Sequence, residues 1–317
     1  MVSAGSVVPW HKLGAIMPDK ALTAIIAAEA AKLQWEVKGE PIFDLDAKQI
    51  PEQKLLRRSD NREVLSIVPE GWNPVQNLQL LEIAEALAQA PGEGDFQPVI
   101  ETAGSLKGGR IVWALVQTGN RQFAGSQHKQ YLLLSNGHYL GRGVRGTLTD
   151  TRVVCNNTLS AAENASASLF TNHYGNVEAR IEAAIDALGW ATAATKSTFA
   201  IYEALAIKPC SKDVAATIYT ELLHKKPKQV ENEDDDEITS SEKQKVEEML
   251  ALFASGAGNE GKTMFDMVNG ATDWVDHFKE YRNSSEMDER RFLDVAIGGN
   301  GASLKKRAVK LALAYGS

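Results

Sequence analysis

The chain has 317 residues, of which 44% are hydrophobic, so it can bury the core of one large domain or two ordinary ones. No run of 18 apolar residues predicts a membrane span, and the start of the chain lacks a secretory signal pattern. Two distant cysteines exclude a disulfide scaffold and favour a reducing cytoplasm, and the net charge of −7 excludes a uniformly basic surface.

The first part of the chain mixes helix and strand patterns. Residues 18–33 have helical composition, residues 35–45 look extended, and a turn at Asp60-Asn61 precedes another strand. A helix is expected over 71–90, with Asn73 as its N-cap, Pro74 at the first helical position and Gln76 completing a capping box.

Strand patterns dominate from Phe96 to about Val154. Residues 110–117 are typical of a buried strand, and Asn136-Gly137 between two apolar runs predicts a tight hairpin turn. Residues 151–160 end a short strand and enter a helix, for which Asn156, Asn157 and Thr158 are the candidate caps.

The rest of the chain is almost wholly helical by pattern, with helices expected over 179–206, 241–254, 263–280, 286–296 and 302–314. Six of the seven residues 231–237 are acidic, which is typical of a solvated linker. This order predicts an α+β fold, in which an antiparallel β-sheet core with flanking helices is followed by a helical C-terminal region. The expected division is a core domain over 1–225, an acidic linker over 226–243 and a helical region over 244–317.

The segment GAGNEGKT, residues 256–263, matches the phosphate-binding pattern G-x-x-x-x-G-K-[ST]. Such a loop has to follow a buried strand, whereas residues 245–255 have the pattern of an amphipathic helix. Too little chain follows the loop to build a nucleotide-binding sheet. An interhelical loop is therefore the favoured interpretation, and a P-loop ATPase is a disfavoured alternative.

No other pattern indicates an enzyme. The histidines form neither HxxxH nor HExxH, and no G-x-S-x-G sequence is present. Cys155 lies where a strand is expected to meet a helix, a position more often taken by a small buried hydrophobe than by a reactive thiol. We therefore expect no catalytic residue, no metal site and no cofactor.

The informative signal is electrostatic. Residues 100–160 hold seven basic and two acidic residues, with aromatic residues between them. Basic side chains neutralise phosphates and aromatic faces stack on bases, although a solvated sheet face explains the pattern equally well. A second basic group on the last expected helix, Lys305, Lys306, Arg307 and Lys310, favours a solvated helical face. The candidate DNA-binding residues are Lys107, Arg110, Lys129, Tyr131, Tyr139, Arg142, Arg145, Arg152, Asn156 and Asn157.

Several segments, in order along nearly the whole chain, resemble the phage/plasmid-like protein family called domain of unknown function 932. They are PWHKLG (9–14), LQWEV (33–37), RSDNREVLSIVPEGWNPVQN (58–77), AGSLKGGRIVWALVQ (103–117), YLLLSNGH (131–138), RVVCNNTL (152–159) and TMFDMVNGATDWVDHF (263–278). The β-rich core and later helices of that family are similar in outline to single-strand annealing recombinases. The resemblance implies an ATP-independent DNA-binding ring or filament and supplies no catalytic residue.

The expected function is therefore single-stranded DNA binding and ATP-independent strand annealing by a cytoplasmic homo-oligomer that does not enter a membrane. The basic residues would hold phosphates, and Tyr131 or Tyr139 would support bases. Asn156 and Asn157 would add polar contacts beside a helix N-terminus. The alternative is a non-enzymatic interaction protein of a mobile element that binds no DNA.

Overall fold

A computed structural model describes residues 13–18, 23–89, 96–152, 157–159, 168–171, 173, 189–224, 239–281 and 286–315. The chain divides into two compact units, which we treat separately. The sheet unit comprises residues 1–121, 129–149 and 164–195, and the helical unit comprises residues 122–128, 150–163 and 196–317. Residues 122–128 and 150–163 group with the later helices, away from the residues on either side of them.

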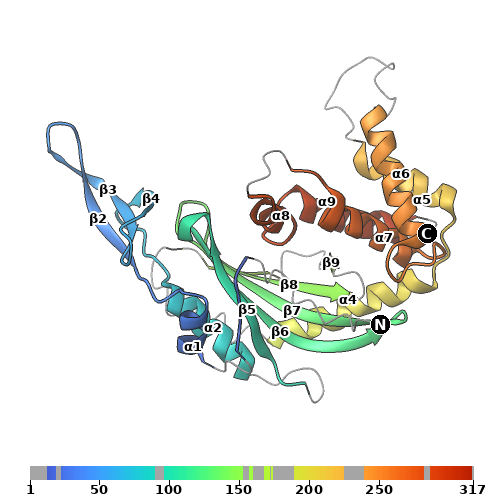
Figure 1. The fold of residues 1–317 in the computed structure, drawn as a ribbon, viewed down its shortest axis with the longest axis horizontal. Helices are drawn as coiled ribbons and strands as arrows, with labels where there is room; N and C mark the ends of the chain where they lie inside the picture. The colour runs from blue at the N-terminus through green and yellow to red at the C-terminus, as the bar shows by residue number, and fades with distance from the viewer. Residues whose placement is uncertain are drawn as a thin grey trace. The chain divides into compact units, whose positions relative to one another are not determined.

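Within the described residues, the larger sheet has seven strands in the order β1-β5-β6-β7-β8-β10, with β9 paired to β8 (Figure 1). β1 pairs with β5 and β5 with β6 in antiparallel fashion, and β8 pairs antiparallel with β10 along its first residues and with β9 along its last. The strands are β1 (Ala15–Ile16), β5 (Val99–Leu106), β6 (Ile111–Phe123), β7 (Ser126–Gly137), β8 (Val144–Arg152), β9 (Asn157–Leu159) and β10 (Ser168–Thr171).

A second, three-stranded antiparallel sheet has the order β2-β3-β4 and lies in the sheet unit (Figure 1). Its strands are β2 (Val37–Phe43), β3 (Gln49–Arg58) and β4 (Val64–Pro69). The Gln76 side chain binds the backbone of the edge strand β2, accepting from Val37 N at 2.8 Å and donating to Val37 O at 3.1 Å. Pro41 in the same strand has no N–H, so β2 is a poor template for a further strand.

Helices α1 (Ala24–Ala30) and α2 (Asn77–Gln89) pack against each other in the sheet unit. Leu80, Leu81 and Ile83 of α2 are buried in its apolar core. The helix begins later than predicted, and the assignment of Asn73 as its N-cap is wrong. Asn73 instead donates its backbone N–H to the carbonyl of His173 at 2.8 Å. The Gln76 side chain is hydrogen-bonded to Val37 of β2 and does not cap the helix. Tertiary partners thus replace the local capping box.

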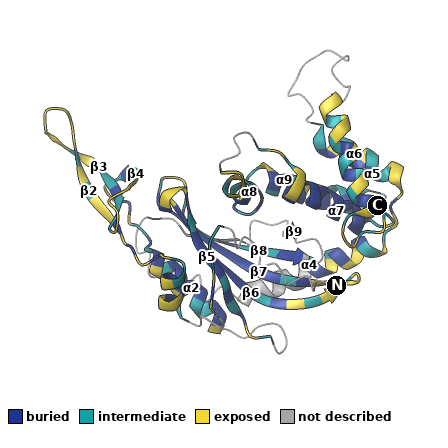
Figure 2. Cartoon of the chain, in the orientation of Figure 1, coloured by how far each residue is buried: buried dark blue, intermediate teal, exposed yellow. Residues whose placement is uncertain are grey.

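The later helices agree with the predicted ranges except for the helix over Lys212–Leu223, which was not predicted. Every residue of α7 is buried, and Figure 2 shows this helix in the colour of buried residues. It packs against α5, α6 and α9, so it forms the centre of the helical unit. The helices are α4 (Gly189–Ile207), α5 (Lys212–Leu223), α6 (Ser240–Ser255), α7 (Met264–Asp273), α8 (Met287–Val295) and α9 (Asn300–Ala314), with a π-helical turn over Trp274–Phe278. The prediction of an α+β fold with C-terminal helices is confirmed.

The tight turn of the larger sheet lies elsewhere than predicted. Ala124 and Gly125, with φ of 45° and 72°, join β6 to β7, and two successive positive φ angles are typical of a type I′ turn. Asn136 and Gly137 lie within β7, and the chain leaves this strand only after Gly137. The buried Asn136 amide donates to Val75 O at 2.8 Å. Asn136 is therefore held by a contact with a distant part of the chain and does not form a local turn.

Candidate nucleic-acid interface

The turn between β5 and β6 exposes two cations. Lys107, Gly108 and Gly109 have φ of 52°, 67° and 99°, which turns the chain tightly after Leu106. Lys107 and Arg110 are both exposed. This part of the sequence prediction therefore lies on an accessible surface of the sheet unit.

The loop between β7 and β8, residues 138–143, lies beside that turn. His138 donates its backbone N–H to Arg110 O at 2.8 Å, and Ser66 of β4 donates its hydroxyl to His138 O at 2.7 Å. Tyr139 and Arg142 on the loop, and Arg145 at the start of β8, are half-buried. Basic residues from two connections thus meet at one end of the sheet.

Arg142 is held close to the backbone of β7. A Cβ atom at Gly137 would collide with Cβ and Cγ of Arg142, so glycine is what allows this approach. Burial is the main cause that lowers the pKa of the Arg142 guanidinium, and the charge of Arg145 lowers it further, whereas Tyr139 raises it. The buried Nε of Arg142 has no hydrogen-bond partner among the described residues. A half-buried guanidinium beside a second arginine is suited to an anionic ligand such as phosphate.

Lys129 and Tyr131 of β7, which were predicted to bind DNA, are not part of the surface formed by the β5–β6 turn and the β7–β8 loop. Tyr131 is 0% exposed and its hydroxyl donates to Glu101 Oε2 at 2.5 Å, so it offers no face to a base. Lys129 Nζ lies 3.0 Å from Glu101 Oε1 in a half-buried ion pair. Glu101 falls at a register shift between β5 and β6. The base-stacking role predicted for Tyr131 is therefore wrong for this structure, and the charge of Lys129 is balanced by a carboxylate.

Three predicted residues fall near the end of β8. Asn156 lies outside the described residues. Arg152 and Asn157 are paired across β8 and β9, so Asn157 is in a strand and not at the start of a helix. The capping role expected for Asn157 is therefore wrong, because the chain pairs with β8 where the sequence suggested a helix.

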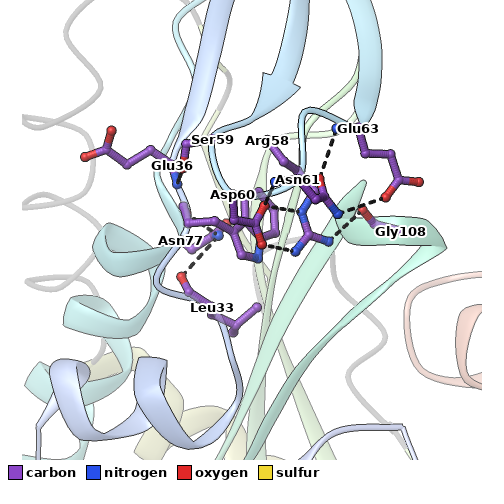
Figure 3. A network of polar contacts seen from close by, with 10 residues as sticks. Leu33, Glu36, Arg58, Ser59, Asp60, Asn61, Glu63, Asn77 and Gly108 are labelled. Atoms are coloured by element: carbon purple, nitrogen blue, oxygen red, sulfur yellow. Dashed lines mark hydrogen bonds and ion pairs between the residues drawn. The ribbon is translucent and has the colours of Figure 1, made fainter.

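Arg58, which no sequence pattern singled out, supports the β5–β6 turn (Figure 3). Its guanidinium lies 4.3 Å from the ring centroid of Trp35 and donates to both carboxylate oxygens of Asp60, at 3.0 and 2.7 Å. It also donates to Gly108 O at 3.1 Å, which fixes the turn that carries Lys107. The Arg58 hydrogen bond is the main cause that lowers the pKa of Asp60. In the sequence, the predicted turn at Asp60-Asn61 was the feature that lay next to Arg58 and could have drawn attention to it.

Buried amides and imidazoles anchor the β7–β8 loop from within. His138 Nε2 lies 3.0 Å from Asn77 Oδ1, and Asn77 Nδ2 donates to Trp35 O at 2.9 Å. Burial, followed by the charge of His173, lowers the pKa of His138 to about 3. The His138 ring is therefore neutral near pH 7, and it serves to position the loop.

The helical unit contains a separate buried pair. His128 Nδ1 lies 2.6 Å from Asp150 Oδ2, and the two side chains are 2% and 6% exposed. The rings of Phe123, Phe199, Tyr202 and Phe265 surround the imidazole at centroid distances of 5.8 to 6.3 Å. Because this cage leaves the imidazole almost no contact with solvent, the pair is part of the core and not an open active site.

The GAGNEGKT segment connects two helices. It follows α6, and Thr263 is the N-cap of α7 in a capping box with Asp266. The backbone N–H groups of Lys262 and Thr263 donate to Asp266 Oδ2 at 3.0 and 3.1 Å. Lys262 Nζ donates to Glu260 Oε2 at 2.8 Å. The groups that would cradle a phosphate are thus bound to carboxylates, and the strand that the P-loop alternative needs is replaced by a helix.

The basic residues of α9 do not act as one group. Lys305 is 2% exposed and its Nζ donates to Asp276 Oδ1 at 2.8 Å. Lys306, Arg307 and Lys310 are exposed, and Arg307 donates to Glu221 O at 2.8 Å. The solvated face expected there applies to these three and not to Lys305.

The protein has an α+β fold. Four basic residues lie on or next to two neighbouring connections at one end of its larger sheet: Lys107, Arg110, Arg142 and Arg145. The sequence profile of the family described as domain of unknown function (DUF932) matches residues 64–295. This match covers more than half of the chain, which therefore belongs to that family. No curated protein and no solved structure matches the sequence. Within the described ranges, no helix could cross a membrane and no group of three or more acidic, histidine or cysteine side chains is arranged to hold a metal ion.

Proposed function

We propose that the protein binds single-stranded DNA and promotes ATP-independent strand annealing, as a cytoplasmic homo-oligomer of a phage or other mobile element. The observation that carries the proposal is the half-buried Arg142, whose Nε lacks a hydrogen-bond partner and whose charged neighbour is Arg145. Lys107 and Arg110 are exposed on the adjoining turn, where the Glu63 carboxylate also lies close to Gly108. Two neighbouring arginines with further exposed cations beside them suit a flexible phosphate backbone.

The proposed mechanism needs no hydrolysis. Arg142 and Arg145 would hold phosphates, and Tyr139 would support a base by stacking. Neutralising the phosphates lowers the repulsion between two strands, and a ring or filament of subunits would keep the bases of one strand in order for pairing. Tyr131 has no part in this mechanism because it is buried.

The test is fluorescence anisotropy of a labelled single-stranded oligonucleotide at several salt concentrations, with and without ATP. We expect salt-sensitive, ATP-independent binding, and the double variant Arg142→Ala with Arg145→Ala should bind more weakly and lower the salt slope by about 2. The matched control replaces two exposed lysines, Lys38 on β2 and Lys48 in the β2–β3 connection, with alanine and should leave the slope unchanged. An unchanged slope in the arginine variant would remove this cluster from the interface.

A second candidate is a protein-interaction factor that binds no DNA. It is favoured by two exposed apolar side chains on β4, Val64 and Ile67. Phe43 and Leu45 are also exposed, but Phe43 pairs with Gln49 and Val64 with Arg57, so the two groups lie at opposite ends of β3. Exposed apolar residues that lie near one another commonly mark contact surfaces. No oligonucleotide binding at low salt, together with loss of biological activity when Val64 and Ile67 are changed to serine, would favour this candidate.

A further inference from the structure

The β7–β8 loop carries an exposed apolar side chain at its apex. Leu140 is 51% exposed. It lies between Tyr139, which is half-buried, and Gly141, which is exposed. Gly141 has φ of 81°, and no atom lies within 4 Å of the position that a Cβ would take. The backbone at the apex is therefore of a kind that glycine favours and is open on one side.

The loop that carries Leu140 has a cationic and no anionic side chain. Residues 138–143 contain no acidic residue, Arg142 follows two positions later, and the His138–Arg110 hydrogen bond brings the exposed Arg110 beside the loop. Phosphates held by these arginines would bring the bases of a strand within reach of the apex. Moving an apolar side chain out of water lowers the free energy of the system, and the faces of two bases can cover it.

We propose that Leu140 is a wedge that inserts between neighbouring bases of a bound single strand. This inference rests on the proposed DNA-binding function and adds to it the residue that unstacks bases. Arg142 and Arg145 give affinity through phosphates, whereas Leu140 acts on the bases. The two contributions therefore differ in their dependence on salt.

Another exposed leucine of the sheet unit provides a matched control. Leu45, between β2 and β3, is fully exposed and is flanked by Asp44 and Asp46. Its neighbours are carboxylates, which repel a phosphate backbone. Leu45→Ala therefore removes the same surface leucine from a place that nucleic acid should avoid.

The experiment uses an oligonucleotide that contains 2-aminopurine, whose fluorescence rises when the base loses its stacked neighbour. We expect the full chain to raise this fluorescence on binding and Leu140→Ala to abolish most of the rise. Anisotropy should show roughly three- to tenfold weaker binding with an unchanged salt slope. Leu140→Met should retain the rise, and Leu45→Ala should behave as the unsubstituted chain.

The outcomes separate the wedge from the proposed function. Tight, salt-sensitive binding with an equal fluorescence rise in Leu140→Ala would overturn the wedge and leave DNA binding in place. A variant that changes self-association and not the 2-aminopurine signal would assign the apex to contacts between copies and would also overturn it. No binding by the unsubstituted chain at low salt would overturn both proposals.

Discussion

At the scale of single residues, His138 shows how a buried polar group makes stability depend on pH. Its ring is 0% exposed and contacts Asn77 through Nε2. Burial lowers its pKa from 6.5 to about 3, and burial also lowers the pKa of His173. The folded chain therefore resists protonation at these rings, and the unfolded chain does not.

The lowered pKa of His138 makes the stability of the folded chain fall at acidic pH. Above about pH 6.5 the ring is neutral in both states and contributes no pH dependence. As the pH falls below that value, the unfolded state takes up a proton that the folded state refuses, so stability falls until about pH 3. Urea unfolding should show about 2 kcal/mol less stability from His138 at pH 5 than at pH 7.

The control for this prediction is His138→Gln, which should give a flatter pH dependence. If that variant does not fold, the imidazole signals of the unsubstituted chain can be followed by NMR. The His138 signal should not titrate between pH 8 and pH 5. A midpoint near 6.5 would contradict the prediction.

At the scale of elements, the sequence predicted what depends on local pattern. The buried strand at 110–117, the strand within 35–45 and the late helices have clear periodicity and were found. The Asn136-Gly137 turn and the Asn73 cap failed because tertiary partners use these residues. Asn136 binds Val75 O, and Asn73 pairs with His173. A single sequence does not reveal such distant partners.

Gly137 gives a prediction at the scale of the β7 strand and its loop. A methyl group at this position would collide with the Arg142 side chain, so Gly137→Ala should displace Arg142 and cost roughly 1–3 kcal/mol of stability. It should also weaken oligonucleotide binding, although it removes no charge. The matched control is Gly71→Ala, whose added Cβ meets no atom within 4 Å. Equal unfolding midpoints and affinities in the two variants would contradict this account.

At the scale of the whole molecule, the sequence identified the charged segment but not its exposed members. Composition placed Lys129, Tyr131 and Arg142 in one candidate set. In the structure, Lys129 is paired with Glu101 and Tyr131 is buried. Arg142 remains half-buried beside Arg145. Which side chains reach the surface depends on strand register and on a bulge at Glu101, and neither can be read from composition.

The two-unit division gives the last prediction, which concerns a fragment of residues 1–225. Such a fragment keeps α4 and α5 but loses α6–α9, and therefore the partners of both helices. Phe265 packs on Tyr202 with ring centroids 5.5 Å apart, and the Tyr219 hydroxyl donates to Met267 O at 2.7 Å. Without these partners the fragment exposes aromatic side chains that are buried in the full chain.

We therefore expect the 1–225 fragment to bind a hydrophobic dye and to self-associate on size-exclusion chromatography. The control is a full chain with a protease site introduced between residues 225 and 238 and then cut. Its two pieces should elute together, because the contacts of α6, α7 and α9 with α5 persist without chain continuity. A monomeric 1–225 fragment that unfolds cooperatively would instead establish the boundary expected from the sequence, and α4 and α5 would then not require the later helices.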